Sequence, residues 1–255
     1  MDLSTVFSLE GKVALITGAS KGIGFAIAEI FAAAGAKVVI CSRKQDVLDE
    51  MANQLKSKGY EATGIACNVG NMAELPSLVE KTVEKYGTID ILVNNAAVNP
   101  VFGPVHETSL DAFDKIMAVN VKAPFELCRL CFPYLRRSSG ASVINISSIG
   151  GLTPETGLGI YSVSKAALIS LTKVFAKEWG EAKIRVNVIC PGLIQTKFSE
   201  ALWTNDKIMN SVMKQLSIKR AGTSEEIGAM ALFLASPASS YTTGAVFTAD
   251  GGFTI

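Results

Sequence analysis

A glycine-rich turn near the start of the chain places the strongest limit on its fold. An apolar run over residues 12–17 leads into Gly18-Ala-Ser-Lys-Gly-Ile-Gly24, and a helix-forming run over 25–34 follows, ended by Gly35. In a strand, glycine turn and helix of this kind, the backbone can approach a pyrophosphate, and the helix N-terminus supplies free N–H groups. Glycine-rich turns also simply connect strands to helices. The strand before and the helix after are the context that a dinucleotide site requires, and we predict one here.

The same alternation continues along the chain. Strand-like runs lie at 12–17, 37–44, 61–67, 89–97, 141–148, 184–190 and 245–250, and helical patterns lie at 25–34, 45–58, 71–86, 109–135 and 161–179. Within 71–86, Pro76 fits a first turn or a kink. No low-complexity linker or internal repeat divides the 255 residues. The pattern predicts an α/β protein: one Rossmann-type domain over 1–255, with a doubly wound, seven-stranded parallel sheet and helices on both faces.

Polar and special residues gather where the predicted strands end. They are Gly18, Ser42, Asn68, Asn94, Ser148 and Pro191. Parallel strands joined by right-handed crossovers share one carboxyl edge, where ligands bind in doubly wound sheets. We therefore expect the ligand site along this edge.

The end of the second predicted strand favours one dinucleotide over the other. NAD-selective sites place an acidic residue there for the ribose 2′-hydroxyl, but this strand ends Cys41-Ser-Arg43. Arginine pairs with a 2′-phosphate. Lys21, inside the glycine turn, is expected to reach the same group. Two bases and no acid predict NADP(H), preferred over NAD(H). The alternative is that Arg43 and Lys44 merely begin a solvated helix.

Tyr161 and Lys165 are four residues apart in a helix-forming segment, which places them on one helix face, one turn apart. A phenol has a reference pKa of about 10, and a nearby ammonium is expected to lower it. Such a pair can exchange a proton with a substrate oxygen. The alternative is a solvated face with the lysine lying past an aromatic ring.

Composition excludes several functions. The net charge of +1 comes without a basic stripe, so we expect neither nucleic acid nor an anionic membrane as a partner. No uncharged apolar run approaches the ~18 residues of a membrane span. The first residues do not resemble a secretory signal, and the last do not match the Ser-Lys-Leu peroxisomal address.

The cysteines and the single histidine complete these expectations. An odd count of five cysteines, three of them in strand-like runs, predicts a reducing, cytoplasmic location. Cys128 and Cys131 form a C-x-x-C, which is a redox or zinc signature in other contexts, but this one lies in a helical pattern without a second pair. With His106 as the only histidine, we predict no metal site.

Taken together, the motifs resemble the short-chain dehydrogenase/reductase family along essentially the whole chain. The matching segments are Thr17-Gly-Ala-Ser-Lys-Gly-Ile-Gly24, Asn94-Asn-Ala-Ala97, Asn120, Ser148, Tyr161-x-x-x-Lys165, and Pro191-Gly192 with Thr196. Ser148 precedes Tyr161 by the family's catalytic spacing, which favours it over Ser147. Two positions depart from the family pattern. Ala97 replaces a usual glycine and crowds the nicotinamide end slightly, and Asn68 replaces a usual aspartate.

The resemblance implies a role for each of these residues. Tyr161 is expected to be the general acid in reduction and Ser148 to donate to the carbonyl oxygen. Lys165 is expected to hold the nicotinamide ribose and lower the Tyr161 pKa, and Asn120 to tie a water to Lys165. Thr196 and the backbone at 193–194 are expected to hold the carboxamide. The expected cofactor-binding residues are Gly18, Ser20, Lys21, Gly22, Ile23, Gly24, Ser42, Arg43, Asn68, Val69, Asn95, Tyr161, Lys165, Pro191, Gly192, Ile194 and Thr196.

The substrate is read less directly. The candidate pocket residues are mostly apolar: Val98, Pro100, Phe102, Ile149, Leu152, Leu158, Phe198 and Trp203. They suit a ketone or aldehyde with hydrophobic flanks, and the chain resembles the NADP-dependent carbonyl/retinal reductase branch of the family. Residues 193–216 look like a substrate lid, or else ordinary core or subunit contacts. The resemblance also implies a homotetramer.

Other functions remain open. One is a 3-oxoacyl-[acyl-carrier-protein] reductase, for which Arg129, Arg136 and Arg137 would supply a basic patch. Another is an alcohol or sugar dehydrogenase acting in the oxidative direction. A nucleotide-binding protein without activity is disfavoured because Asn120, Ser148, Tyr161 and Lys165 are all present.

Overall fold

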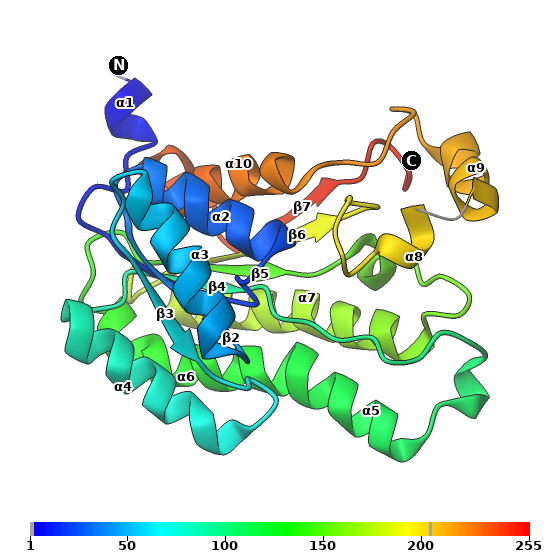
Figure 1. The fold of residues 1–255 in the computed structure, drawn as a ribbon, viewed down its shortest axis with the longest axis horizontal. Helices are drawn as coiled ribbons and strands as arrows, with labels where there is room; N and C mark the ends of the chain where they lie inside the picture. Colours follow the sequence, from blue (N-terminus) through cyan, green and yellow to red (C-terminus); the bar gives the residue numbers. More distant parts are fainter. Residues whose placement is uncertain (1–2, 204–205) are drawn as a thin grey trace.

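The fold is a parallel sheet between two layers of helices, in a computed structural model that describes residues 3–203 and 206–255 (Figure 1). The strand order is β3-β2-β1-β4-β5-β6-β7, and every neighbouring pair is parallel. The strands are β1 (Val13–Thr17), β2 (Lys37–Ser42), β3 (Ala62–Ala66), β4 (Ile91–Asn94), β5 (Ser142–Ile146), β6 (Arg185–Pro191) and β7 (Val246–Ala249). The order reverses between β1 and β4. The predicted doubly wound sheet is confirmed, and this reversal marks the place where such sheets bind ligands.

Each face of the sheet has its own apolar core, because side chains alternate along the strands. On one face, Ile16 and Ile40 pack with helices α2 (Gly22–Ala33), α3 (Gln45–Ser57) and α10 (Ser224–Ala235). On the other face, Leu15 and Val39 pack with α4 (Leu75–Tyr86), α6 (Ala123–Leu135) and α7 (Gly159–Trp179). Figure 1 shows these two layers above and below the strands. The short α1 (Leu3–Val6) precedes the first strand.

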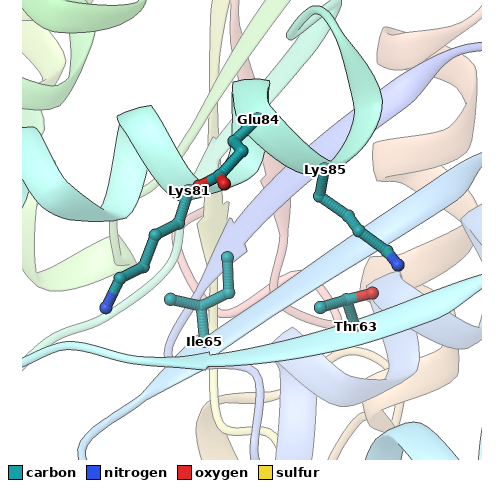
Figure 2. Close-up of a pocket in the computed structure, with 5 residues that line it drawn as sticks. All are labelled: Thr63, Ile65, Lys81, Glu84 and Lys85. Atoms are coloured by element: carbon teal, nitrogen blue, oxygen red, sulfur yellow. The ribbon is translucent and has the colours of Figure 1, made fainter.

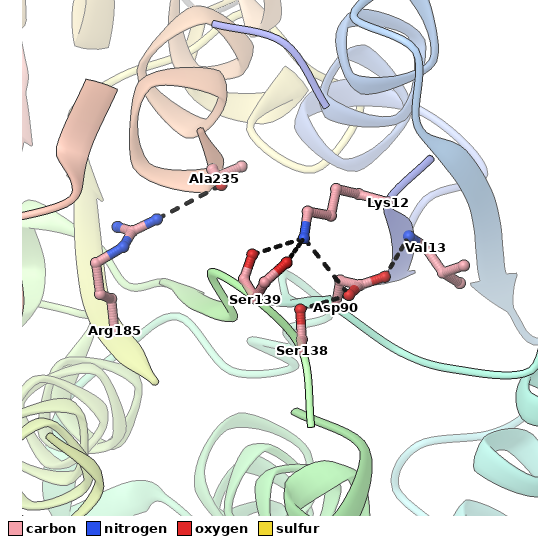
Figure 3. Close-up of polar contacts among 7 residues, drawn as sticks. All are labelled: Lys12, Val13, Asp90, Ser138, Ser139, Arg185 and Ala235. Carbon is pink, nitrogen blue, oxygen red and sulfur yellow. Dashed lines mark hydrogen bonds and ion pairs between the residues drawn. The ribbon is translucent and has the colours of Figure 1, made fainter. Parts of the chain in front are cut away.

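The amino-end edge of the sheet is closed by polar side chains (Figure 3). The Asp90 carboxylate accepts from the Val13 N–H at 2.9 Å and from the Ser138 hydroxyl, and lies 3.8 Å from Lys12 Nζ. Arg185 donates to Ser239 Oγ at 2.7 Å, at the end of α10. Here the backbone N–H of Val13, at the start of β1, finds a side-chain acceptor. The predicted functional residues lie at the opposite edge of the sheet.

The long helix expected over 109–135 is real but not uniform. It consists of α5 (Leu110–Met117), a π-helical turn over Ala118–Lys122, and α6. Wider π turns interrupt α-helices mostly at functional sites, and Asn120 lies within this one. In the 71–86 segment, Pro76 occupies the first turn of α4, as one of the two predicted placements had it.

The predicted lid region contains two short helices, α8 (Glu200–Trp203) and α9 (Asp206–Gln215). Residues 204–205 of that prediction lie outside the described residues. The segment before α8 is held by its own hydrogen bonds, since Ser199 Oγ donates to the Ile194 carbonyl and the Trp203 indole N–H donates to the Thr196 carbonyl at 2.9 Å. No described helix is long and apolar enough to cross a bilayer.

Candidate active site

The glycine turn has the backbone shape that a phosphate site needs. Gly18 and Gly22 have φ angles of 65° and 58°, in the left-handed region that favours glycine. A Cβ at Gly24 would lie 2.5 Å from the Gly18 carbonyl oxygen, so a side chain there would push the turn open. Helix α2 begins at Gly22 without a side-chain cap. Its first N–H groups are therefore available to an anion, and the turn fits a dinucleotide pyrophosphate.

Asn95 fixes the turn from the neighbouring strand. Its amide nitrogen donates to the carbonyls of Thr17 and Gly18 at 2.9 and 3.0 Å. The Thr17 hydroxyl in turn accepts from the backbone N–H groups of Asn95 and Ala96, each at 3.1 Å. Thr17 is a supporting residue to which the sequence analysis gave no role. Its place one residue before the glycine turn was the available signal.

The end of β2 and the glycine turn meet on the adenosine side. Ser42 Oγ donates to Ser20 Oγ at 3.1 Å, which brings together two predicted residues from segments far apart in sequence. Arg43 and Lys21 are both exposed beside them. Asn68 Oδ1 accepts from the Gly70 N–H at 3.2 Å, while Val69 is buried. Two bases therefore flank this end of the turn.

The opposite wall comes from the segment after β6. A Cβ at Gly22 would lie 3.3 Å from the Thr196 methyl group, so Thr196 and the glycine turn are neighbours. Gly192 packs against Asp250, and Ile194 pairs with Gly222 through an isolated parallel bridge. Pro191, the last residue of β6, is buried. Of the predicted residues at this strand end, Thr196 is thus the one that lies against the turn.

Tyr161 and Lys165 lie one turn apart on α7, as predicted, and both are buried. Lys165 Nζ is 5.6 Å from the centre of the Tyr161 ring and donates to the Ile146 carbonyl at 2.8 Å. Burial of both groups excludes the solvated-face alternative. The lysine is held by the end of β5, directly under the tyrosine.

The pKa values differ from the sequence expectation. Burial raises the pKa of Tyr161 to about 12, although its contact with the Ser148 hydroxyl acts to lower it. Burial also lowers the pKa of Lys165 to about 8. The expectation that Lys165 brings the Tyr161 pKa below its usual value is therefore wrong for this structure. Burial, which disfavours the charged phenolate, is the largest cause, and the Lys165 ammonium donates to the Ile146 carbonyl.

The two adjacent serines have separate roles. Ser147 is buried and donates to the Lys165 carbonyl at 2.8 Å, so it ties β5 to α7. Ser148 is only half-buried, accepts from the Gly150 N–H at 3.1 Å and contacts the Tyr161 phenol. Ser148, as predicted, is therefore the serine beside the reactive hydroxyl.

Asn120 lies on the π turn and is fully buried. Its Oδ1 accepts from the Val98 N–H at 2.9 Å, and its Nδ2 donates to the Val98 carbonyl and to Ser164 Oγ, each at 3.0 Å. The side chain reaches α7 through Ser164, and the predicted water-mediated contact with Lys165 stays a prediction. The sequence analysis did not single out Ser164.

Aromatic side chains lie at the mouth of the site. The Phe198 ring centre is 6.3 Å from that of Tyr161, and Phe102 packs against Gly157. Both phenyl groups are mostly exposed, at 60% and 70%. Leu152 is exposed as well, while Ile149 is buried beneath it. Substrate would therefore reach Tyr161 past apolar surfaces.

Other hypotheses from the sequence lose support. Cys128 and Cys131 are fully buried on α6, and burial raises the pKa of the Cys128 thiol to about 12, so it is unreactive. Within the described part of the chain, no group of three or more His, Cys, Asp or Glu side chains is placed to hold a metal ion. A hollow of about 360 Å³ lies between β3 and α4. Figure 2 shows the residues that line it, and none of them is a predicted site residue.

A glycine turn at the switch point of a doubly wound sheet, beside a buried Tyr-Lys pair and a half-buried serine, defines an oxidoreductase site of the nicotinamide-dependent type. Comparison with known proteins agrees, since the family described as "Enoyl-(Acyl carrier protein) reductase" matches residues 18–254. The chain belongs to the short-chain dehydrogenase/reductase family.

Individual relatives align over nearly the whole chain. Tropinone reductase-like 3 of Erythroxylum coca is 42% identical over 95% of this chain and 93% of its own length. Human dehydrogenase/reductase SDR family member 4 is 42% identical over 96% of this chain and 88% of its own length. A gluconate 5-dehydrogenase from Burkholderia cenocepacia, solved with NADP and tartrate, superposes with a TM-score of 0.95, 29% identity and 99% coverage of both chains.

Proposed function

We propose that this protein is an NADP(H)-dependent carbonyl reductase that converts a ketone or aldehyde into an alcohol. The observation that carries the proposal is the position of the buried Tyr161–Lys165 pair, with Ser148 in contact with the tyrosine at the carboxyl edge that also holds the glycine turn. These groups can supply a proton and stabilise an oxyanion next to a bound dinucleotide.

The reactive groups divide the work. The nicotinamide, when bound, supplies the hydride. Tyr161 donates its phenolic proton to the carbonyl oxygen, and its pKa of about 12 keeps that proton in place at neutral pH. Ser148 donates a hydrogen bond to the same oxygen and disperses its developing charge. Lys165, with a pKa near 8, is mostly a cation at neutral pH and stabilises the phenolate that remains.

The preference for NADP(H) rests on the end of β2. Arg43 and Lys21 are exposed on either side of the Ser42–Ser20 contact, and no acidic residue occupies the strand end. A guanidinium there favours a 2′-phosphate, which a carboxylate would repel. The presence of NADP in the Burkholderia structure is consistent with this choice.

The substrate class follows from the mouth of the site. Phe198, Phe102 and Leu152 offer apolar contacts, which suit a carbonyl compound with hydrophobic flanks. Relatives with names such as tropinone reductase-like support reduction of a ketone. Sugar-acid oxidation is the second candidate, since gluconate dehydrogenases superpose closely. The first candidate is preferred because the ring that lies beside Tyr161, that of Phe198, is apolar. Reduction of a 3-oxoacyl thioester remains a third.

We also propose a homotetramer in a reducing, cytoplasmic compartment, formed from one domain per chain. All five cysteines are buried free thiols, which suits that compartment. The outer faces of α5 and α7 carry exposed apolar side chains, including Leu110, Val163 and Val174, which suit a helix-to-helix subunit contact.

The test is a carbonyl panel with consumption of NADPH as the readout, run on the wild type and on Tyr161→Phe. The panel holds aromatic ketones, α-dicarbonyls and acetoacetyl thioesters, with sugar acids and NADP⁺ for the reverse direction. Loss of the phenolic proton is expected to reduce kcat by about 10³-fold, within the usual range for a general acid. NADPH affinity, measured by fluorescence titration, is expected to stay within threefold.

Tyr134→Phe is the matched control, because it removes a phenol on α6 that contacts none of the proposed reactive groups. Full turnover in Tyr161→Phe would remove that residue from the mechanism. Turnover of sugar acids alone would replace carbonyl reduction by the second candidate.

A further inference from the structure

A hydrogen-bonded path connects the loop after β4 to the catalytic helix. It begins at Val98, whose N–H and carbonyl both bond the Asn120 amide, at 2.9 and 3.0 Å. The Asn120 Nδ2 uses its second hydrogen for Ser164 Oγ at 3.0 Å. The Ser164 hydroxyl then donates to the Tyr161 carbonyl at 2.6 Å. Asn120 and Ser164 are both fully buried, so water does not compete for these bonds.

Ser164 is the link between two parts of the site that are built separately. On one side, Asn120 holds the Val98 loop, which follows the Asn95 that bonds the Gly18 carbonyl. On the other side, Ser164 bonds the backbone of Tyr161 itself. The hydroxyl is acceptor to the first and donor to the second, a combination that neither alanine nor glycine can supply.

We infer that Ser164 is a positioning residue that sets the Tyr161 hydroxyl relative to the cofactor cleft by tying α7 to Asn120. The inference rests on the proposed reductase activity and adds a residue to its machinery. Removal of the hydroxyl leaves one Asn120 N–H buried without an acceptor and frees the Asn120 side chain to turn. The hydrogen bonds that fix the Tyr161 backbone relative to the Val98 loop are then lost.

Ser162 provides a matched control on the same helix. It is buried like Ser164 and adjacent to Tyr161, but its hydroxyl has no hydrogen-bond partner among the described residues. Ser162→Ala and Ser164→Ala therefore remove the same atom from equally buried positions two residues apart. Only Ser164→Ala breaks the path, so a difference between the two variants reports the hydrogen bonds and not the packing.

The experiment compares kcat, KM for NADPH and NADPH affinity in the wild type, Ser164→Ala and Ser162→Ala. Ser164→Ala is expected to lower kcat at least 10-fold with KM for NADPH within twofold, because the glycine turn is untouched. Ser162→Ala is expected to remain within twofold of wild type in both constants. A Ser164→Ala enzyme with near wild-type kcat, or an equal loss in both variants, would overturn the inference.

Amide hydrogen exchange separates this result from failure of the proposed reaction. The Val98 N–H is bonded to Asn120 Oδ1, so its exchange is expected to accelerate in Ser164→Ala and not in Ser162→Ala, whether or not a substrate has been found. If wild type reduces no carbonyl compound but this exchange pattern holds, the proposed function fails and the positioning role stands. Unchanged exchange at Val98 sinks the positioning role.

Ser164→Thr covers the case in which Ser164→Ala does not fold. Threonine keeps the hydroxyl, and its kcat is expected to lie within threefold of wild type. A folded Ser164→Thr protein with a kcat as low as that expected for alanine would contradict the inference, since the required hydroxyl is still present.

Discussion

One acidic residue, Glu155 in the loop before α7, acts on Tyr161 through its charge. Its carboxylate acts through its charge to raise the Tyr161 pKa, in the same direction as burial. A phenolate and a carboxylate repel each other, so the acid keeps the phenol protonated to higher pH. Glu155 therefore favours the reductive direction, which needs the proton.

Glu155→Gln is expected to lower the Tyr161 pKa, because the repelling charge is removed and the phenolate becomes easier to form. The pH profile of alcohol oxidation, which needs the phenolate, should shift to lower pH. The measurement is kcat/KM for the alcohol with NADP⁺ from pH 6 to 10. Glu84→Gln, on α4 away from the site, is the control and should leave the profile in place. A shift to higher pH would contradict the assigned charge effect.

Arg43 carries the assignment of the 2′-phosphate. In Arg43→Asp a charge-assisted pairing is replaced by repulsion, and the ratio of kcat/KM for NADPH over NADH is expected to fall about 30-fold, the equivalent of about 2 kcal/mol. Lys44→Asp makes the same charge change one residue along and should alter the ratio by less than threefold. Equal effects of Arg43→Asp and Lys44→Asp on the ratio would indicate that only the overall charge of this region matters, and not a specific contact of Arg43 with the 2′-phosphate.

At the scale of elements, α10 is held at its start by a capping box. The Thr223 side chain pairs with the backbone N–H of Glu226, the third residue of the helix. The Glu226 carboxylate in turn accepts from the Thr223 N–H at 2.8 Å. Arg220 also donates to both Glu226 oxygens, at 2.9 and 2.6 Å, and this contact lowers the pKa of Glu226 to about 2. Since the folded value lies below the unfolded one, the carboxylate adds stability above the unfolded pKa.

Glu226→Gln keeps an acceptor for the cap and removes only the charge. The variant is expected to be less stable than wild type at pH 7, and the difference should narrow as pH falls from about 4.3, the unfolded pKa, towards 2. Urea unfolding between pH 3 and pH 7 measures it. Glu225→Gln, the exposed acid next to it, is the control. A difference that widens at low pH would show that the sign of the linkage is wrong.

The elements that sequence predicted well are those with a strong period or a strong stop. The seven strands and the helical segments expected at 25–34, 45–58, 71–86, 109–135 and 161–179 follow from apolar runs bounded by glycine and polar residues, whereas α10 was not predicted. The strand-end rule collected Ser42, Asn68 and Ser148 at one edge. Boundaries were less certain. Helix α2 begins at Gly22 and not at Phe25, because the helix starts directly from the tight turn in which Gly22 has a positive φ and which Asn95 closes.

The parts that sequence missed depend on contacts across the fold. The π turn at Asn120 could not be predicted, since its residue types do not distinguish it from an α-helical turn. Thr17 and Ser164 act through hydrogen bonds to distant segments, which a linear pattern does not contain. The Tyr161 pKa was misjudged because its largest cause is burial, which is a property of the whole fold.

At the scale of the molecule, the helical layer of α5, α6 and α7 carries several exposed apolar side chains. Leu110 and Phe113 on α5, Phe125 on α6, and Val163 and Val174 on α7 are all at least 37% exposed. Helices α5 and α7 are in contact, and Figure 1 shows α5, α6 and α7 in the same layer. A partner chain would cover it.

Light scattering is expected to give the wild type a mass four times the 26.9 kDa of one chain. Val174→Glu places a charge on this surface, away from Tyr161, and should reduce the mass to that of a smaller species by making burial costly. Phe7→Glu, which changes an exposed phenyl group beside α1, should leave the mass unchanged. A wild type that scatters as a monomer would refute the tetramer.

The closed amino-end rim described around Asp90 and Arg185 has a practical consequence for protein engineering. Because the proposed reactive groups lie at the other rim, the Asp90 cluster and the reactive groups consist of separate sets of side chains. Changes that strengthen the Asp90 cluster and changes that reshape the Phe198 mouth share no partner, so their energetic effects should add when combined. In a biocatalyst built on this scaffold, the protein could therefore be stabilised first and its substrate specificity changed afterwards.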